Sequence, residues 1–116
     1  MFNIVYYEKS DGTKPVAAFI KGLEPKMKTK VLREIQLLKE FGNTLGEPHS
    51  KSLKNGLFEL RIKQGSNISR VLYFFFVGNK IILTNGFVKK EQKTPPSQIE
   101  LAAKYKADYE RRHKNG

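Results

Sequence analysis

The sequence lacks several residue types that whole classes of function depend on. It has no cysteine and no tryptophan, and its only histidines are His49 and His113. Without cysteine the chain forms no disulfide and offers no thiolate nucleophile. Two histidines without cysteine are too few for the usual protein-only zinc site. We therefore expect neither a metal ion nor another cofactor.

Long apolar runs and familiar catalytic motifs are missing as well. No hydrophobic stretch approaches the ~20 residues that a membrane-spanning helix needs, and no signal-peptide pattern opens the chain. No phosphate-cradling glycine loop or Ser-His-Asp order is present. These absences favour a cytoplasmic protein that makes no contact with a membrane.

Acidic residues are scarce too, and their scarcity is uneven. The chain has 22 lysines and arginines against 11 aspartates and glutamates, which gives a formal net charge of +11. Residues 49–93 carry nine basic and two acidic side chains, whereas residues 1–48 carry eight and six, and residues 94–116 carry five and three. The excess positive charge therefore sits in one part of the chain, as expected of a protein that binds a polyanion such as a nucleic acid.

The length of 116 residues suits a single domain over residues 1–116. Met27, Val31, Ile35 and Leu38 recur at spacings of three and four, which predicts an amphipathic helix. Prolines open each expected helix. In chain order, we expect a strand over residues 1–7, a helix over residues 15–21, a helix from Pro25 to Gly42, a loop over residues 43–56, strands over residues 57–63, 68–77 and 80–88, and a last helix capped by Thr94.

Together these elements predict an α+β fold. A small antiparallel sheet, made of the N-terminal strand and a three-stranded C-terminal meander, packs with two N-terminal helices and a C-terminal helix. The strand over residues 68–77 is almost wholly apolar, so it should be central and covered on both faces. Residues 111–116, a polar and mostly basic tail, should fray.

The turns of the meander set which side chains face each other. If Gly65-Ser66 and Gly78-Asn79 are both two-residue turns, Arg61 lies opposite Arg70 and Arg70 lies opposite Phe87. Two like charges opposite each other destabilise a sheet, and an anionic ligand would relieve the repulsion. Because a guanidinium binds phosphate with two parallel hydrogen bonds and an aromatic ring stacks on a base, this face predicts a nucleic-acid pocket.

The sequence leaves two possible roles for each of two other polar residues, Glu59 and His49. Glu59 either pairs with a neighbouring cation or acts as a general base. His49 lies in the loop, where it is either an ordinary exposed imidazole or a possible base.

Two segments, Gly56-Leu-Phe-Glu-Leu-Arg61 and Phe87-Val-Lys-Lys-Glu-Gln-Lys-Thr-Pro95, occur in an order that resembles the RelE/ParE toxin superfamily. The likeness is to its phage-derived Gp49-like, HigB-type branch, and it extends over nearly the whole chain. It implies a RelE-like fold and the toxin of a type II toxin–antitoxin system. Such toxins are ribosome-dependent endoribonucleases that cut mRNA, and a small HigA-like antitoxin with a helix-turn-helix neutralises them. The toxin itself would meet operator DNA only through that antitoxin.

The resemblance also implies roles for residues. Arg70 would stabilise the transition state, Arg61 would bind the phosphate, and Glu59 would be the base. Where many relatives carry a histidine near the end of the last strand, this chain has Asn85, which cannot exchange a proton near neutral pH. His49 is the alternative base. The expected RNA-binding residues are Lys89, Lys90, Lys93, Lys63, Lys54 and Phe87.

The same fold serves other activities, so two alternatives stay open. One is inhibition of DNA gyrase in the manner of ParE. The other is a nucleic-acid-binding module without catalysis, which would use the same basic face.

Overall fold

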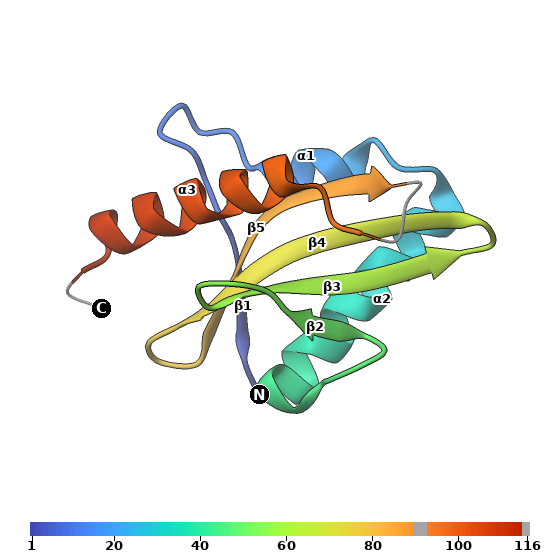
Figure 1. Ribbon diagram of the computed structural model, residues 1–116, viewed down its shortest axis with the longest axis horizontal. Coiled ribbons are helices and arrows are strands. Elements are labelled where there is room, and N and C mark those ends of the chain that lie inside the picture. The colour runs from blue at the N-terminus through green and yellow to red at the C-terminus, as the bar shows by residue number, and fades with distance from the viewer. Residues whose placement is uncertain (90–92, 115–116) are drawn as a thin grey trace.

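A computed structural model describes residues 1–89 and 93–114 (Figure 1). It confirms the predicted α+β class and most of the predicted elements. The helices and strands are β1 (Asn3–Tyr6), α1 (Pro15–Lys21), α2 (Pro25–Phe41), β2 (Ser50–Ser52), β3 (Leu57–Gln64), β4 (Asn67–Phe76), β5 (Lys80–Lys89) and α3 (Pro96–Arg112), with a short 3-10 turn over Gly42–Thr44 after α2.

The strands form one five-stranded sheet in the order β1-β5-β4-β3-β2. As predicted, β4 is central. The sheet is mostly antiparallel, as predicted, and β1 runs parallel to β5 at its edge. The connection between them contains α1, α2 and the strands β2 to β4, so it is long enough for the crossover that a parallel pair requires. The loop expected over residues 43–56 also contains β2, which pairs with β3.

Helices cover both faces of the sheet (Figure 1). On one face α1 and α2 bury Val16, Ile20 and the predicted apolar stripe of α2 against β3, β4 and β5. On the other face α3 buries Ala102 and Tyr109 against Leu72 and Phe74 of β4. Side chains alternate between the two layers along β3 and β4, because successive residues of a strand point to opposite faces.

The two ends of α3 differ from the sequence prediction. Thr94 does not cap the helix, since its hydroxyl bonds elsewhere and the residue at the N-cap position is Pro95. At the other end, Arg111 and Arg112 do not fray but continue the helix. Both form ion pairs with Asp108 of the preceding turn.

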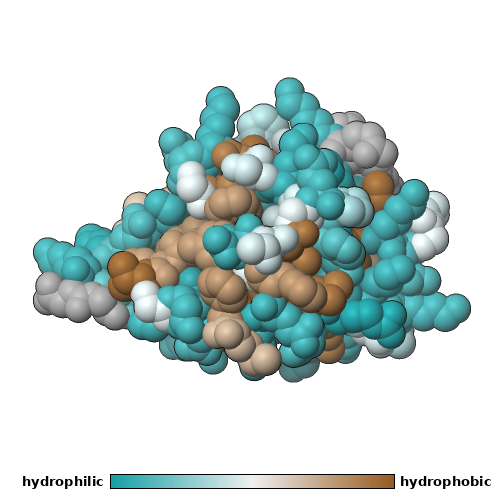
Figure 2. Space-filling view, turned by 90° about the horizontal axis from the view of Figure 1, so that it is seen from below, coloured by the Kyte–Doolittle hydropathy of each residue, from teal (hydrophilic) through white to brown (hydrophobic). Residues whose placement is uncertain are grey.

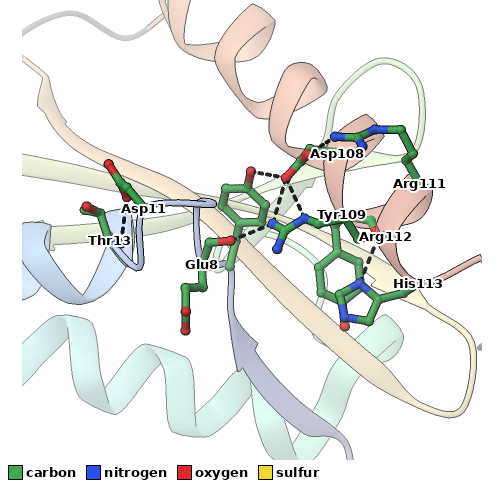
Figure 3. A network of polar contacts seen from close by, with 9 residues as sticks. Glu8, Asp11, Thr13, Asp108, Tyr109, Arg111, Arg112 and His113 are labelled. Atoms are coloured by element: carbon green, nitrogen blue, oxygen red, sulfur yellow. Dashed lines mark hydrogen bonds and ion pairs between the residues drawn. The ribbon is translucent and has the colours of Figure 1, made fainter.

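Asp108 anchors this end of the helix to the N-terminal part of the chain (Figure 3). Its carboxylate accepts a hydrogen bond from the Tyr7 hydroxyl, with a distance of 2.6 Å between Oδ2 and the phenol oxygen. Arg112 donates to the backbone carbonyl of Glu8 at 2.6 Å. Side-chain contacts thus join the end of α3 to the segment after β1, about a hundred residues away in sequence.

Apolar side chains gather over the middle of one face of the molecule, surrounded by hydrophilic ones (Figure 2). The aromatic residues Phe2, Phe58, Tyr73 and Phe75 form a contiguous cluster with ring centroids 5.2 to 6.1 Å apart. They extend the core beneath α2 towards the surface.

Candidate functional site

The registers of β3, β4 and β5 bring Arg61, Arg70 and Phe87 side by side. Arg61 is paired with Arg70, and Arg70 is paired with Phe87, as predicted. Gly65-Ser66 is a two-residue turn, which fixes the first pairing. All three side chains lie on the face of the sheet that carries α3, because Leu72 and Phe74 of the same strand pack there.

The second pairing arises by a different route from the one expected. The β4–β5 turn has three residues, Val77 to Asn79, because Phe76 is paired with Lys80. A β-bulge opposite Leu72/Tyr73 then shifts the register by one residue, so the two departures cancel at Arg70. The prediction of a two-residue turn was wrong, while the predicted partner of Arg70 is confirmed.

Glu59 lies between the two arginines and binds both. Its Oε2 atom accepts a hydrogen bond from Arg61 Nε at 3.1 Å and lies 3.5 Å from Arg70 Nε. Its Oε1 atom accepts a hydrogen bond from the hydroxyl of Thr94. Only 2% of the Glu59 side chain is exposed. A carboxylate so enclosed and so committed to cations is better suited to orient the arginines than to take a proton from a substrate.

The two arginines differ in access. Arg70 is buried, and one Nη atom donates to the carbonyl of Ser69 at 3.3 Å. Burial lowers the pKa of its guanidinium, the Glu59 charge counteracts this, and Arg61 adds to the lowering. Arg61 keeps 26% of its side chain exposed. The three groups together carry a charge of +1, and an incoming phosphate reaches Arg61 first.

Arg61 and Arg70 line a hollow of about 380 Å³ at the end of the sheet. His49, the residue before β2, lines it too, and its carbonyl accepts a hydrogen bond from the backbone N–H of Arg61 at 2.8 Å. From α2, which covers the other face of the sheet, Lys30 and Glu34 also line the hollow. The hollow is lined by Lys30, Glu34, Pro48, His49, Arg61, Ile62, Lys63, Ile68 and Arg70.

His49 and Glu34 form a pair within this hollow. The distance from His49 Nδ1 to Glu34 Oε1 is 2.8 Å. The His49 side chain is 41% exposed and that of Glu34 is 11% exposed. An ionised carboxylate only accepts hydrogen bonds, so Nδ1 must carry the proton, and in the neutral imidazole Nε2 is left as the acceptor. This arrangement of base and orienting carboxylate suits general-base catalysis.

The remaining RNA-binding candidates differ in how exposed their side chains are. Lys63 is exposed and lines the hollow. Lys93 is exposed, and Phe87 is half buried against the core under α3. Lys89 is only 6% exposed.

One predicted residue, Lys54, does not join the site. Lys54 precedes β3 and so lies at the opposite end of that strand from Arg61. Lys90 lies outside the described residues. Asn85 is buried and donates hydrogen bonds to Gln98 of α3, so it does not face the hollow.

Sequence reasoning missed Glu34, Lys30 and the contact of Thr94. One feature of the sequence could have indicated Glu34, because this residue falls within the apolar stripe of α2, between Val31 and Leu38. A carboxylate at such a position is buried only when it has a partner. The sequence did not show that this partner is His49.

No group of three or more His, Asp or Glu side chains among the residues the structure describes is arranged to hold a metal ion. In the same part of the chain, no helix is both long and apolar enough to cross a membrane.

Comparison with known families gives one match. The model of the family described as phage-derived protein Gp49-like (DUF891) matches residues 18–107, which include every residue of the hollow. The chain belongs to this family. It is a family of RelE/HigB-type toxins, which confirms the family suggested by the two sequence segments. No curated protein sequence matches the chain significantly.

Proposed function

We propose that this Gp49-like protein is a metal-independent, ribosome-dependent endoribonuclease that cuts mRNA and thereby stops translation. One observation carries the proposal: the His49–Glu34 pair lines the same hollow as Arg61 and Arg70, the two arginines that Glu59 joins. A base, an orienting carboxylate and a cationic phosphate site are what RNA cleavage by an internal nucleophile requires.

In the proposed reaction the 2′-OH of a nucleotide attacks the adjacent phosphate. His49 Nε2 accepts the 2′ proton as the O2′–P bond forms. Arg61, held by Glu59 and backed by Arg70, stabilises the charge that develops on the phosphoryl oxygens. The P–O5′ bond then breaks, and the ammonium group of Lys63 or Lys30 gives a proton to the leaving oxygen. The products are a 2′,3′-cyclic phosphate and a 5′-hydroxyl end.

Glu59 has a different role here from the one that the resemblance implied. We propose that it neutralises part of the arginine charge and fixes the direction of both guanidinium groups. His49 takes over as base. Phe87, which is paired with Arg70, and the exposed Lys93, which precedes Thr94, would contact the RNA.

As a toxin, the protein implies an antitoxin as its partner. We propose that this is a HigA-like helix-turn-helix protein, which binds the toxin and carries it to operator DNA. A toxin with a net charge of +11 favours an antitoxin that is acidic at the contact surface.

Primer extension on translating ribosomes tests the proposed function. The wild-type protein should produce cuts within mRNA at the ribosomal decoding site. Arg61→Ala should reduce the cutting by about 100- to 1000-fold, the cost of removing one donor to a developing negative charge. Inhibited DNA supercoiling without RNA cutting would favour gyrase inhibition instead, and RNA binding without either activity would favour a non-catalytic module.

A further inference from the structure

A second hollow adjoins the first, on the outer side of α2. It has a volume of about 390 Å³ and is lined by Pro25, Lys26, Thr29, Lys30, Arg33 and Gln64. Lys30 lines both hollows, so the two are neighbours. Gln64 ends β3, and α2 passes behind this end of the sheet (Figure 1).

The lining of the second hollow is cationic and contains no acidic residue. Lys26, Lys30 and Arg33 are four and three residues apart, which places them on one face of α2. Among the ion pairs formed by the described residues, none includes these three side chains, whereas Arg111 and Arg112 of α3 pair with Asp108.

Three like charges on one helix face repel each other, and like pairs four residues apart destabilise a helix. A bound polyanion removes that repulsion. Thr29 and Gln64 add neutral hydrogen-bonding groups beside the cations, and such groups commonly contact phosphate and sugar oxygens of nucleic acids. The lining therefore suits a sugar–phosphate backbone better than a single small anion.

We propose that the second hollow binds the backbone of the same single-stranded RNA, at nucleotides adjacent to the one that is cut. This inference rests on the proposed function, because it takes the first hollow as the cleavage pocket. The RNA then runs from Arg61 past Lys30 and over α2 to Lys26 and Arg33. The second hollow contributes affinity and holds the strand in register, while the chemistry stays in the first.

The salt dependence of RNA binding tests this inference. The probe is a short single-stranded RNA with 2′-O-methyl sugars, which the proposed reaction cannot cut, and binding is followed by fluorescence anisotropy at several salt concentrations. The double variant Lys26→Gln/Arg33→Gln leaves every residue of the first hollow in place. Because each phosphate contact contributes about 0.7 to the slope of log K against log salt, the slope should fall by about 1.4.

The matched control is Lys104→Gln/Lys114→Gln, which removes the same charge from exposed positions that line neither of these hollows. Its slope should stay near the wild-type value. An unchanged slope in the α2 variant, or an equal fall in the control, overturns the inference. So does an α2 variant that binds the RNA normally but binds vacant ribosomes weakly, since its contacts then go to ribosomal RNA.

The same experiment separates this inference from the proposed function. If the wild-type protein cuts mRNA but the α2 variant keeps its full slope, only the second hollow is wrong. If the α2 variant loses slope but the wild-type protein never cuts mRNA on ribosomes, the hollow stands as an RNA site and the nuclease assignment fails. If the wild-type protein does not bind the RNA, the inference is wrong, and primer extension on ribosomes decides the proposed function by itself.

Discussion

At the scale of single residues, the account depends on which side chain takes the 2′ proton. Glu59 and His49 both lie near Arg61, but they differ in access. Glu59 is enclosed by two arginines and Thr94, whereas His49 is 41% exposed and has its Nδ1 atom held by Glu34. The geometry therefore favours His49.

His49→Gln should lower the cleavage rate by about 100- to 10,000-fold, the usual contribution of a general base. Glutamine keeps hydrogen-bonding capacity but accepts no proton. Single-turnover cleavage on programmed ribosomes measures the effect. The matched control is His113→Gln, since His113 lies at the end of α3, where it stacks on Tyr109. Equal rates for wild type and His49→Gln would remove His49 from the mechanism.

Thr94 provides a second test at this scale, because its hydroxyl is bound to the carboxylate that orients both arginines. Thr94→Val keeps the shape but removes the donor, so Glu59 and Arg61 lose their fixed positions. We expect kcat to fall by roughly tenfold or more, with a smaller change in KM. Thr94→Ser keeps the hydroxyl and should restore most of the rate.

A purely structural role for Thr94 predicts something else. In that case the valine and serine variants would differ in thermal stability but cleave at the same rate once folded. Steady-state cleavage and thermal unfolding, measured on both variants, separate the two roles.

At the scale of secondary structure, local pattern predicted most elements and missed those set by distant contacts. Proline and glycine positions fixed the bounds of α1 and α2, and alternation predicted β3. The bulge in β5 has no marker in its own residues, because it depends on how that strand meets β4. The parallel pairing of β1 with β5 also joins segments about 80 residues apart.

In the candidate site, too, the features set by local sequence could be predicted and those set by distant contacts could not. The facing arginines followed from one two-residue turn, which is a local feature. The pairing of His49 with Glu34 depends on how the loop before β2 packs against α2. The residues around His49 and those around Glu34 do not by themselves indicate that the two side chains meet. Thr94 reaches Glu59 across 35 positions, so its role could not be read from the helix start that it precedes.

The anchoring of α3 gives a prediction about stability. Hydrogen bonds from Tyr7, then from Arg112, lower the pKa of Asp108 in the folded protein. A carboxyl whose pKa is depressed by folding stabilises the protein above its unfolded pKa of about 3.9, and this contribution is lost as the pH falls through the folded value. Asp108→Asn should therefore lower the melting temperature near pH 7.

The difference between wild type and Asp108→Asn should shrink as the pH is lowered below about 4, because the wild-type carboxyl then becomes neutral too. Thermal unfolding followed by circular dichroism between pH 7 and pH 2.5 measures both curves. A difference that stays constant over this range would show that the charge of Asp108 does not stabilise the fold.

At the scale of the whole molecule, the net charge of +11 influences how fast charged partners associate with the protein. Both hollows and the exposed face of α2 carry the same sign, so the protein should attract acidic partners from a distance. The association rate with the antitoxin should fall roughly tenfold or more as salt is raised from low to high concentration. Stopped-flow mixing measures this, and a rate that does not depend on salt would rule out an acidic contact surface.

The central claim is that RNA itself supplies the nucleophile while His49, Arg61 and Arg70 assist it. The most direct measurement uses mRNA on ribosomes with a single 2′-deoxy sugar at the mapped cut site, compared with the unmodified mRNA. The account predicts that the unmodified strand yields a 2′,3′-cyclic phosphate and a 5′-hydroxyl end, and that the deoxy strand stays intact at that position. Cutting of the deoxy strand at the same bond and rate would contradict it.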